Sequence, residues 1–113
     1  MALTATITLN RTTAPVGQKV TAVVVVSNSA GSPVTLTEIV PQIKKTALTF
    51  PTDASPVAVG KCRVDQTVPA AGSETYVFDV CFQSASTSEE VGCIIYSADG
   101  QTVSPTPDTI SIT

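Results

Sequence analysis

Strict alternation of apolar and polar residues constrains this chain more than any other feature of its sequence. The apolar positions of the first alternating segment are Leu3, Ala5, Ile7 and Leu9, with a threonine at each position between them. A later segment repeats the pattern with larger side chains, Tyr76, Phe78, Val80 and Phe82. Successive side chains of a strand point to opposite faces of a sheet, so a period of two predicts strands with one buried face.

Turn residues divide the rest of the chain into further short strands. The strands that we expect are residues 3–9, 19–26, 34–40, 75–82, 91–97 and 109–113, with another within 43–50 and one or two within 57–68. Pro41 is expected to end the third strand, and residues 84–88 are expected to form a loop. Asp99 and Gly100 favour a tight hairpin turn, because Asp-Gly tolerates the positive φ that such turns need.

These strands predict an all-β fold, since no segment keeps a helical period for more than one turn. About seven to nine short strands with turns every 8–12 residues are typical of an antiparallel, immunoglobulin-like sandwich of two sheets. A jelly roll or a small barrel is the alternative. A length of 113 residues fits one domain with one core, so residues 1–113 are expected to form a single domain.

Composition excludes several kinds of chemistry. The chain has no histidine, which rules out Ser-His-Asp and Cys-His nucleophile arrangements and every histidine-containing zinc site. The cysteines lack C-x-x-C spacing, and residues 97–100 hold a single carboxylate where a calcium loop needs several. We therefore expect no enzyme activity, no catalytic residue, no metal and no cofactor.

Charge and hydropathy exclude two classes of partner. Six Lys and Arg stand against nine Asp and Glu, a balance opposite to that of a protein that neutralises nucleic-acid phosphates. The longest apolar run, residues 22–26, is far shorter than the roughly 20 residues of a membrane-spanning helix. No basic residue precedes Arg11, and no signal peptide is expected. We expect neither nucleic acid nor membrane as a partner.

Three cysteines and one aspartate carry specific expectations. Cys62, Cys81 and Cys93 are expected to be small buried side chains. A Cys81–Cys93 disulfide is the alternative, if their consecutive strands pair as a hairpin. Asp79 interrupts the aromatic strand and points, by parity, to the face opposite the aromatic side chains. We expect Asp79 to be exposed on an edge or to face a partner.

Two stretches resemble bacterial immunoglobulin-like repeats of the CARDB type. Residues 14–21 (APVGQKVT), 24–29 (VVVSNS) and 33–36 (PVTL) are similar to the Pro-x-Gly turn and the strands with which such repeats open. Residues 68–78 (VPAAGSETYVF) resemble the same family's Pro-x-x-Gly-x-x-x-Tyr entry into its core aromatic strand. The resemblance covers residues 14–82 and implies an immunoglobulin-like fold, but fold alone does not imply function.

One departure from that family matters, because CARDB-like repeats normally occur in tandem in long secreted chains. Here one copy follows Met1, and we expect no export signal. A single sandwich of this size, rich in Ser and Thr, resembles small bacteriophage virion proteins: capsid decoration (cement) proteins and the immunoglobulin-like modules of head fibres or tails. That resemblance implies synthesis in the host cytoplasm and a place on the capsid surface of the virion.

Candidate partner-binding residues fall in two regions. Four of the six basic residues gather in the middle of the chain: Lys44, Lys45, Lys61 and Arg63. They are either solubilising charges on edge strands or a basic face that meets an acidic partner. Leu3 and Ile7 of the first strand, and the proline-rich approach to the last strand, are further candidates.

We therefore expect a non-enzymatic virion structural protein, a bacteriophage capsid decoration or cement protein that binds and stabilises the lattice of the major capsid protein. Only 13% of the residues are charged, and such a surface can pack against protein with little desolvation of ions. A homo-oligomer, either a trimer or a dimer, is expected. The alternative is an immunoglobulin-like adhesion or binding module of a bacterial surface protein or of a phage tail or fibre protein.

Overall fold

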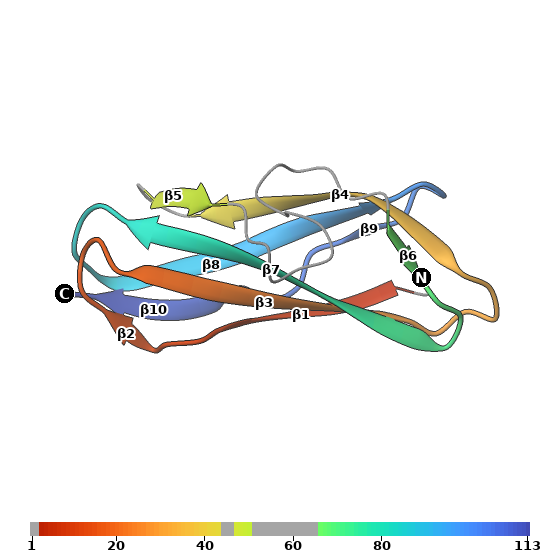
Figure 1. Ribbon diagram of the computed structural model, residues 1–113, viewed down its shortest axis with the longest axis horizontal. Coiled ribbons are helices and arrows are strands. Elements are labelled where there is room, and N and C mark those ends of the chain that lie inside the picture. Colours follow the sequence, from red (N-terminus) through yellow and green to blue (C-terminus); the bar gives the residue numbers. More distant parts are fainter. Residues whose placement is uncertain (1–2, 44–46, 51–65) are drawn as a thin grey trace.

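The computed structural model describes residues 3–43, 47–50 and 66–113, and every regular element among them is a strand (Figure 1). The strands are β1 (Leu3–Leu9), β2 (Thr13–Ala14), β3 (Lys19–Asn28), β4 (Val34–Ile43), β5 (Ala47–Phe50), β6 (Gln66–Val68), β7 (Gly72–Phe82), β8 (Ser86–Ser97), β9 (Thr102–Val103) and β10 (Asp108–Ile112). The all-β prediction is confirmed, and β1 has the predicted bounds.

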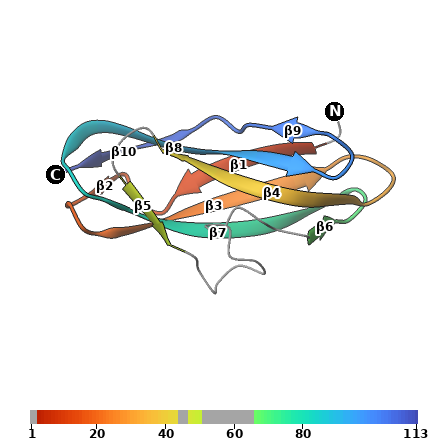
Figure 2. The same ribbon diagram turned by 90° about the horizontal axis from the view of Figure 1, so that it is seen from above.

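The strands form two sheets that pack face to face, with β3 and β7 in one layer and β8 and β10 in the other (Figure 2). The four-stranded sheet has the order β1-β3-β7-β5. The six-stranded sheet has the order β2-β10-β8-β4-β6, with β9 paired to β8. In an immunoglobulin domain, strands A-B-E-D form one sheet and G-F-C the other. The orders β1-β3-β7-β5 and β10-β8-β4 match this arrangement, which confirms the predicted sandwich.

The core lies between the sheets and is filled by alternate residues of the strands. The four-stranded sheet contributes Leu3, Ile7, Leu9, Val20, Ala22, Val24, Val26, Tyr76, Phe78, Val80 and Phe82. The six-stranded sheet contributes chiefly Leu36, Ile39, Val91, Cys93, Ile95, Ile110 and Ile112. The small Ala22 lies opposite Phe78 across β3 and β7, which leaves room for the aromatic ring. Both alternating segments therefore face inward as predicted.

Pro41 does not end the third strand, contrary to the sequence expectation. β4 continues to Ile43, and Pro41 lies opposite Cys93 of β8. On its other side, β4 pairs with β6 only from Val34 to Leu36. Proline has no N–H to donate, so it is tolerated where one side of a strand lacks a partner. Within the described residues, Pro41 occupies such a stretch.

The aromatic strand and its successor start earlier than predicted, while the hairpin turn after β8 is confirmed. β7 begins at Gly72, and β8 begins at Ser86, inside the expected loop, because its first half pairs with β10. After β8, Gly100 has a φ of +90° and its N–H donates to the Ser97 carbonyl at 3.2 Å. Of the segment 57–68, only β6 lies within the described residues.

Candidate functional site

The outer face of the four-stranded sheet carries an uncharged patch of hydroxyl and valine side chains. Three rows cross β1, β3 and β7 in register: Thr4–Ser27–Ser73, Thr6–Val25–Thr75 and Thr8–Val23–Val77. The β1 threonines are exposed, and the β3 valines in the middle of the patch are half-buried. We call these nine residues the threonine face. β-Branched side chains suit a pleated surface of this kind.

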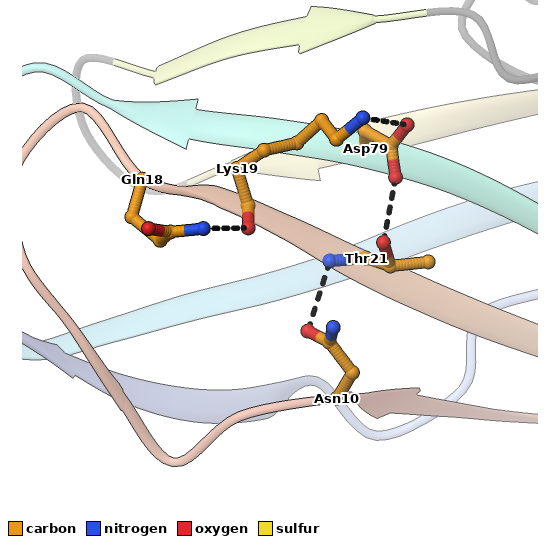
Figure 3. A network of polar contacts seen from close by, with 5 residues as sticks. All are labelled: Asn10, Gln18, Lys19, Thr21 and Asp79. Carbon is orange, nitrogen blue, oxygen red and sulfur yellow. Dashed lines mark hydrogen bonds and ion pairs between the residues drawn. The ribbon is translucent and has the colours of Figure 1, made fainter.

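A polar network borders the threonine face at the next row (Figure 3). The Thr21 hydroxyl donates to Asp79 Oδ1 at 2.7 Å, and Lys19 Nζ lies 3.9 Å from Asp79 Oδ2. The backbone N–H of Thr21 donates to Asn10 Oδ1 at 3.0 Å. One lysine and one hydroxyl thus satisfy the carboxylate at the border of the patch.

Asp79 is not exposed, contrary to the sequence expectation. It does lie on the outer face, as its parity indicates, yet it is only 6% exposed. β7 is central at this point, with Thr21 of β3 and Phe50 of β5 opposite Asp79 in the two registers. The residues that pair with its carboxylate come from β3, so the sequence around Asp79 gives no sign of them.

The six predicted partner-binding residues do not come together on a described surface. Leu3 and Ile7 lie in the core, 3% and 6% exposed, because the inward face of β1 packs against the opposite sheet. The surface of this strand is formed by its threonines instead. Lys44, Lys45, Lys61 and Arg63 lie outside the described residues.

The edge of β1 is capped by one side chain of β10 and one of the turn between β8 and β9. The Leu3 N–H donates to Gln101 Oε1 at 3.2 Å, and the Leu9 N–H donates to Asp108 Oδ2 at 2.8 Å. An open strand edge invites another strand, and proteins protect such edges by covering their backbone groups. The two caps, one near each end of β1, disfavour addition of a partner strand here.

Cys81 and Cys93 are both free, and the alternative disulfide prediction is wrong. The strands that carry them are consecutive but belong to different sheets, so they do not form a hairpin. Cys93 is buried in the core, as expected, whereas Cys81 is half-buried on the outer face beside Lys19. Burial raises the pKa of the Cys93 thiol to about 12. Cys62 lies outside the described residues.

Tyr76 is fully buried, and its hydroxyl has no hydrogen-bond partner among the described residues. Burial, with a smaller contribution from the negative charge of Glu74, raises the pKa of Tyr76 from 10.0 to about 12. The hydroxyl therefore stays protonated in the fold over a pH range in which the unfolded chain releases the proton.

Alkaline pH is expected to destabilise the fold through Tyr76 and Cys93. Both pKa values are raised in the fold. The stability that these two protonated groups contribute is therefore complete below pH 9 and is lost as pH rises towards 12. Each proton released only on unfolding lowers the free energy of unfolding by about 1.4 kcal/mol per pH unit. The urea midpoint of the wild type should fall between pH 7 and pH 11. The midpoint of a Tyr76→Phe variant should fall less over the same range. An equal fall in both proteins would contradict this prediction.

The described residues contain no group of three or more His, Cys, Asp or Glu side chains that could hold a metal ion. No helix long and apolar enough to cross a membrane is found in the described part of the chain.

No family model matches this chain, and no curated protein matches it. Among solved structures, it is similar to the sporulation control protein Spo0M from Bacillus subtilis, with 15% identity and a TM-score of 0.68 over 99% of this chain. It is also similar to the cupredoxin domain of amoB from Nitrosocaldus yellowstonii, with 7% identity and a TM-score of 0.66, covering 99% of this chain and 87% of that one. The chain spans 49% of the Spo0M chain. At such identities these structures show a shared β-sandwich fold alone.

Proposed function

We propose that this chain is a non-enzymatic virion structural protein, a bacteriophage capsid decoration protein that binds and stabilises the lattice of the major capsid protein. The observation that carries the proposal is the threonine face. It offers three rows of side chains from three adjacent strands, and none of its nine residues is charged.

An uncharged face of this kind suits tight contact with another protein. Charged groups must shed water when they are buried at an interface, and interface centres are depleted in them. Hydroxyl groups can donate and accept hydrogen bonds, while Val23, Val25 and Val77 supply apolar area between them. In the row that borders the face, Lys19 pairs with Asp79, so this carboxylate already has a cationic partner.

The β1 edge supports contact through the face rather than strand addition. Gln101 and Asp108 already accept hydrogen bonds from two N–H groups of β1. A partner strand would have to displace both side chains. The outer face of the sheet, by contrast, can contact a lattice of repeated subunits without any change in the pairing of its strands.

Particles purified from the source of this chain provide the test. Mass spectrometry should detect the chain in particles that also contain the major capsid protein. Particles without the chain would overturn the proposal and would favour an immunoglobulin-like adhesion or binding module of a bacterial surface protein or of a phage tail or fibre.

A charge in the middle of the threonine face should weaken binding to the capsid. Thr6→Lys places an ammonium group in the central row, where it must lose water on binding. We expect its occupancy on particles to fall at least tenfold, measured by co-sedimentation and quantitative mass spectrometry. The matched control is Thr12→Lys, an exposed position in the turn after β1, which should bind as the wild type does. Equal occupancy of the two variants would remove the threonine face from the proposal.

A further inference from the structure

The outer face of the six-stranded sheet carries an exposed aromatic side chain beside an apolar strip. Tyr96 on β8 is 36% exposed, whereas Tyr76, Phe78 and Phe82 are buried. Ile94 precedes it on the same face of β8 and is half-buried. Three pairs link β8 to β4 on this face: Tyr96 with Glu38, Ile94 with Val40, and Gly92 with Gln42. Tyrosine is enriched among the residues that dominate binding at protein interfaces.

A shallow hollow lies on the same face, on the other side of Ile94. Its volume is about 320 Å³, and it is lined by Gln42, Gly92, Cys93, Ile94 and residues 104–107. Gly92 forms part of its floor, and the absence of a side chain there lets Pro107 pack against β8 at the border of the hollow. A Cβ atom at this position would lie only 3.3 Å from Cγ of Pro107. β8 therefore presents a protruding ring two residues after Ile94 and a hollow two residues before it.

This arrangement is self-complementary. Consider a twofold axis that lies between two facing copies and crosses the strands at the Ile94–Val40 pair. It places β8 of one copy antiparallel over β8 of the other, with Ile94 over Ile94. Each Tyr96 ring then lies over the hollow at Gly92 of the second copy. Closed dimers commonly use such a surface, in which residue i contacts residue j in both directions.

The polar residues match under the same axis. Because Glu38 lies beside Tyr96 and Gln42 beside Gly92, each Glu38 faces Gln42 of the second copy. A carboxylate accepts hydrogen bonds and a glutamine amide donates them. No like charges meet among these facing pairs. The centre of the contact is apolar and its margin is polar, as in specific protein interfaces.

We propose that this face binds a second copy of the chain, forming a dimer in which Tyr96 of each copy enters the hollow between Gln42 and Pro107 of the other. The molecule measures 45 × 23 × 19 Å, and its broad face can supply the roughly 800 Å² per partner of a stable interface. The threonine face lies on the opposite sheet and stays uncovered. The dimer therefore does not depend on the proposed capsid function, and each can fail without the other.

Sedimentation equilibrium of the purified full chain tests the dimer. The wild type should show a concentration-dependent dimer. Ile94→Arg brings two like charges together at the axis. This variant should stay monomeric up to a concentration 100-fold higher than the one at which the wild type dimerises. Tyr96→Ala should weaken the dimer at least tenfold. Thr12→Lys, in the turn after β1, is the control and should dimerise as the wild type does. A wild type that stays monomeric, or a dimer that survives Ile94→Arg, would overturn the proposal.

A charge pair tests the register itself. Gln42→Glu should weaken the dimer, because two carboxylates then face each other across it. Adding Glu38→Lys to Gln42→Glu should restore the dimer, since opposite charges now meet. Within one copy these positions are four residues apart on β4, too far for direct contact. Circular dichroism and urea unfolding confirm that each variant folds. Failure of the double variant to restore a dimer would overturn this register.

Discussion

Glu89→Met is expected to raise the free energy of unfolding by roughly 1–3 kcal/mol, since a buried polar group without a hydrogen bond carries a penalty of this size. Glu89 is 1% exposed, and neither carboxylate oxygen has a hydrogen-bond partner among the described residues. Its side chain points inward with Val91 and Cys93, opposite Ile110 of β10. Methionine keeps a similar volume and removes both unsatisfied acceptors.

Urea unfolding at pH 7 measures this effect. Glu90→Met is the matched control, because the neighbouring Glu90 is exposed on the other face of β8 and its replacement should change the free energy by less than about 1 kcal/mol. Glu89→Gln keeps the shape and replaces the carboxyl group by an amide, so it shows whether the effect depends on the carboxyl group itself. A lower urea midpoint for Glu89→Met than for the wild type would show that the carboxylate is stabilising where it lies.

Phe78→Ala is expected to lower the free energy of unfolding by about 3–5 kcal/mol, the largest effect that we predict for a single substitution. Phe78 is fully buried in the middle of β7, and its neighbour across the strand pair is the small Ala22. Ala22 cannot fill the space that the ring leaves, so a cavity remains between the sheets.

The control for Phe78→Ala is Val77→Ala, the adjacent residue on the threonine face. Val77 is half-buried on the outside, so its truncation should lower the free energy by less than about 1.5 kcal/mol. Both values come from urea unfolding at one pH. Equal losses for the two variants would mean that the inward and outward faces of β7 are wrongly assigned.

The sequence predicted the sandwich because its strongest signals are local. β1 has the predicted bounds, and the inward face of β7 is the predicted one, since a period of two can be recognised within seven or eight residues. The turn at Gly100 is equally local, because one residue with positive φ decides it.

What the sequence could not predict depends on strands that are distant along the chain. Asp79 is buried because Thr21 and Lys19 of β3 reach its carboxylate from 58 and 60 positions away. Cys81 and Cys93 lie on consecutive strands that enter different sheets. The threonine face can be recognised only when the registers of β1, β3 and β7 are known together. From the sequence alone, only the alternating threonines of β1 could be recognised. The proline-rich approach to the last strand, residues 104–107, was a predicted candidate for partner binding, but its place beside the hollow at Gly92 was not predicted.

A titration measures binding of the chain to the capsid lattice through the threonine face. Purified chain is added to particles that have been stripped of it, and the bound chain is counted against the major capsid protein by quantitative mass spectrometry. We expect saturation at a fixed ratio set by the symmetry of the lattice, with Thr6→Lys failing to reach that ratio at the same concentration. Binding that never saturates, or that Thr6→Lys matches at every concentration, would contradict this expectation.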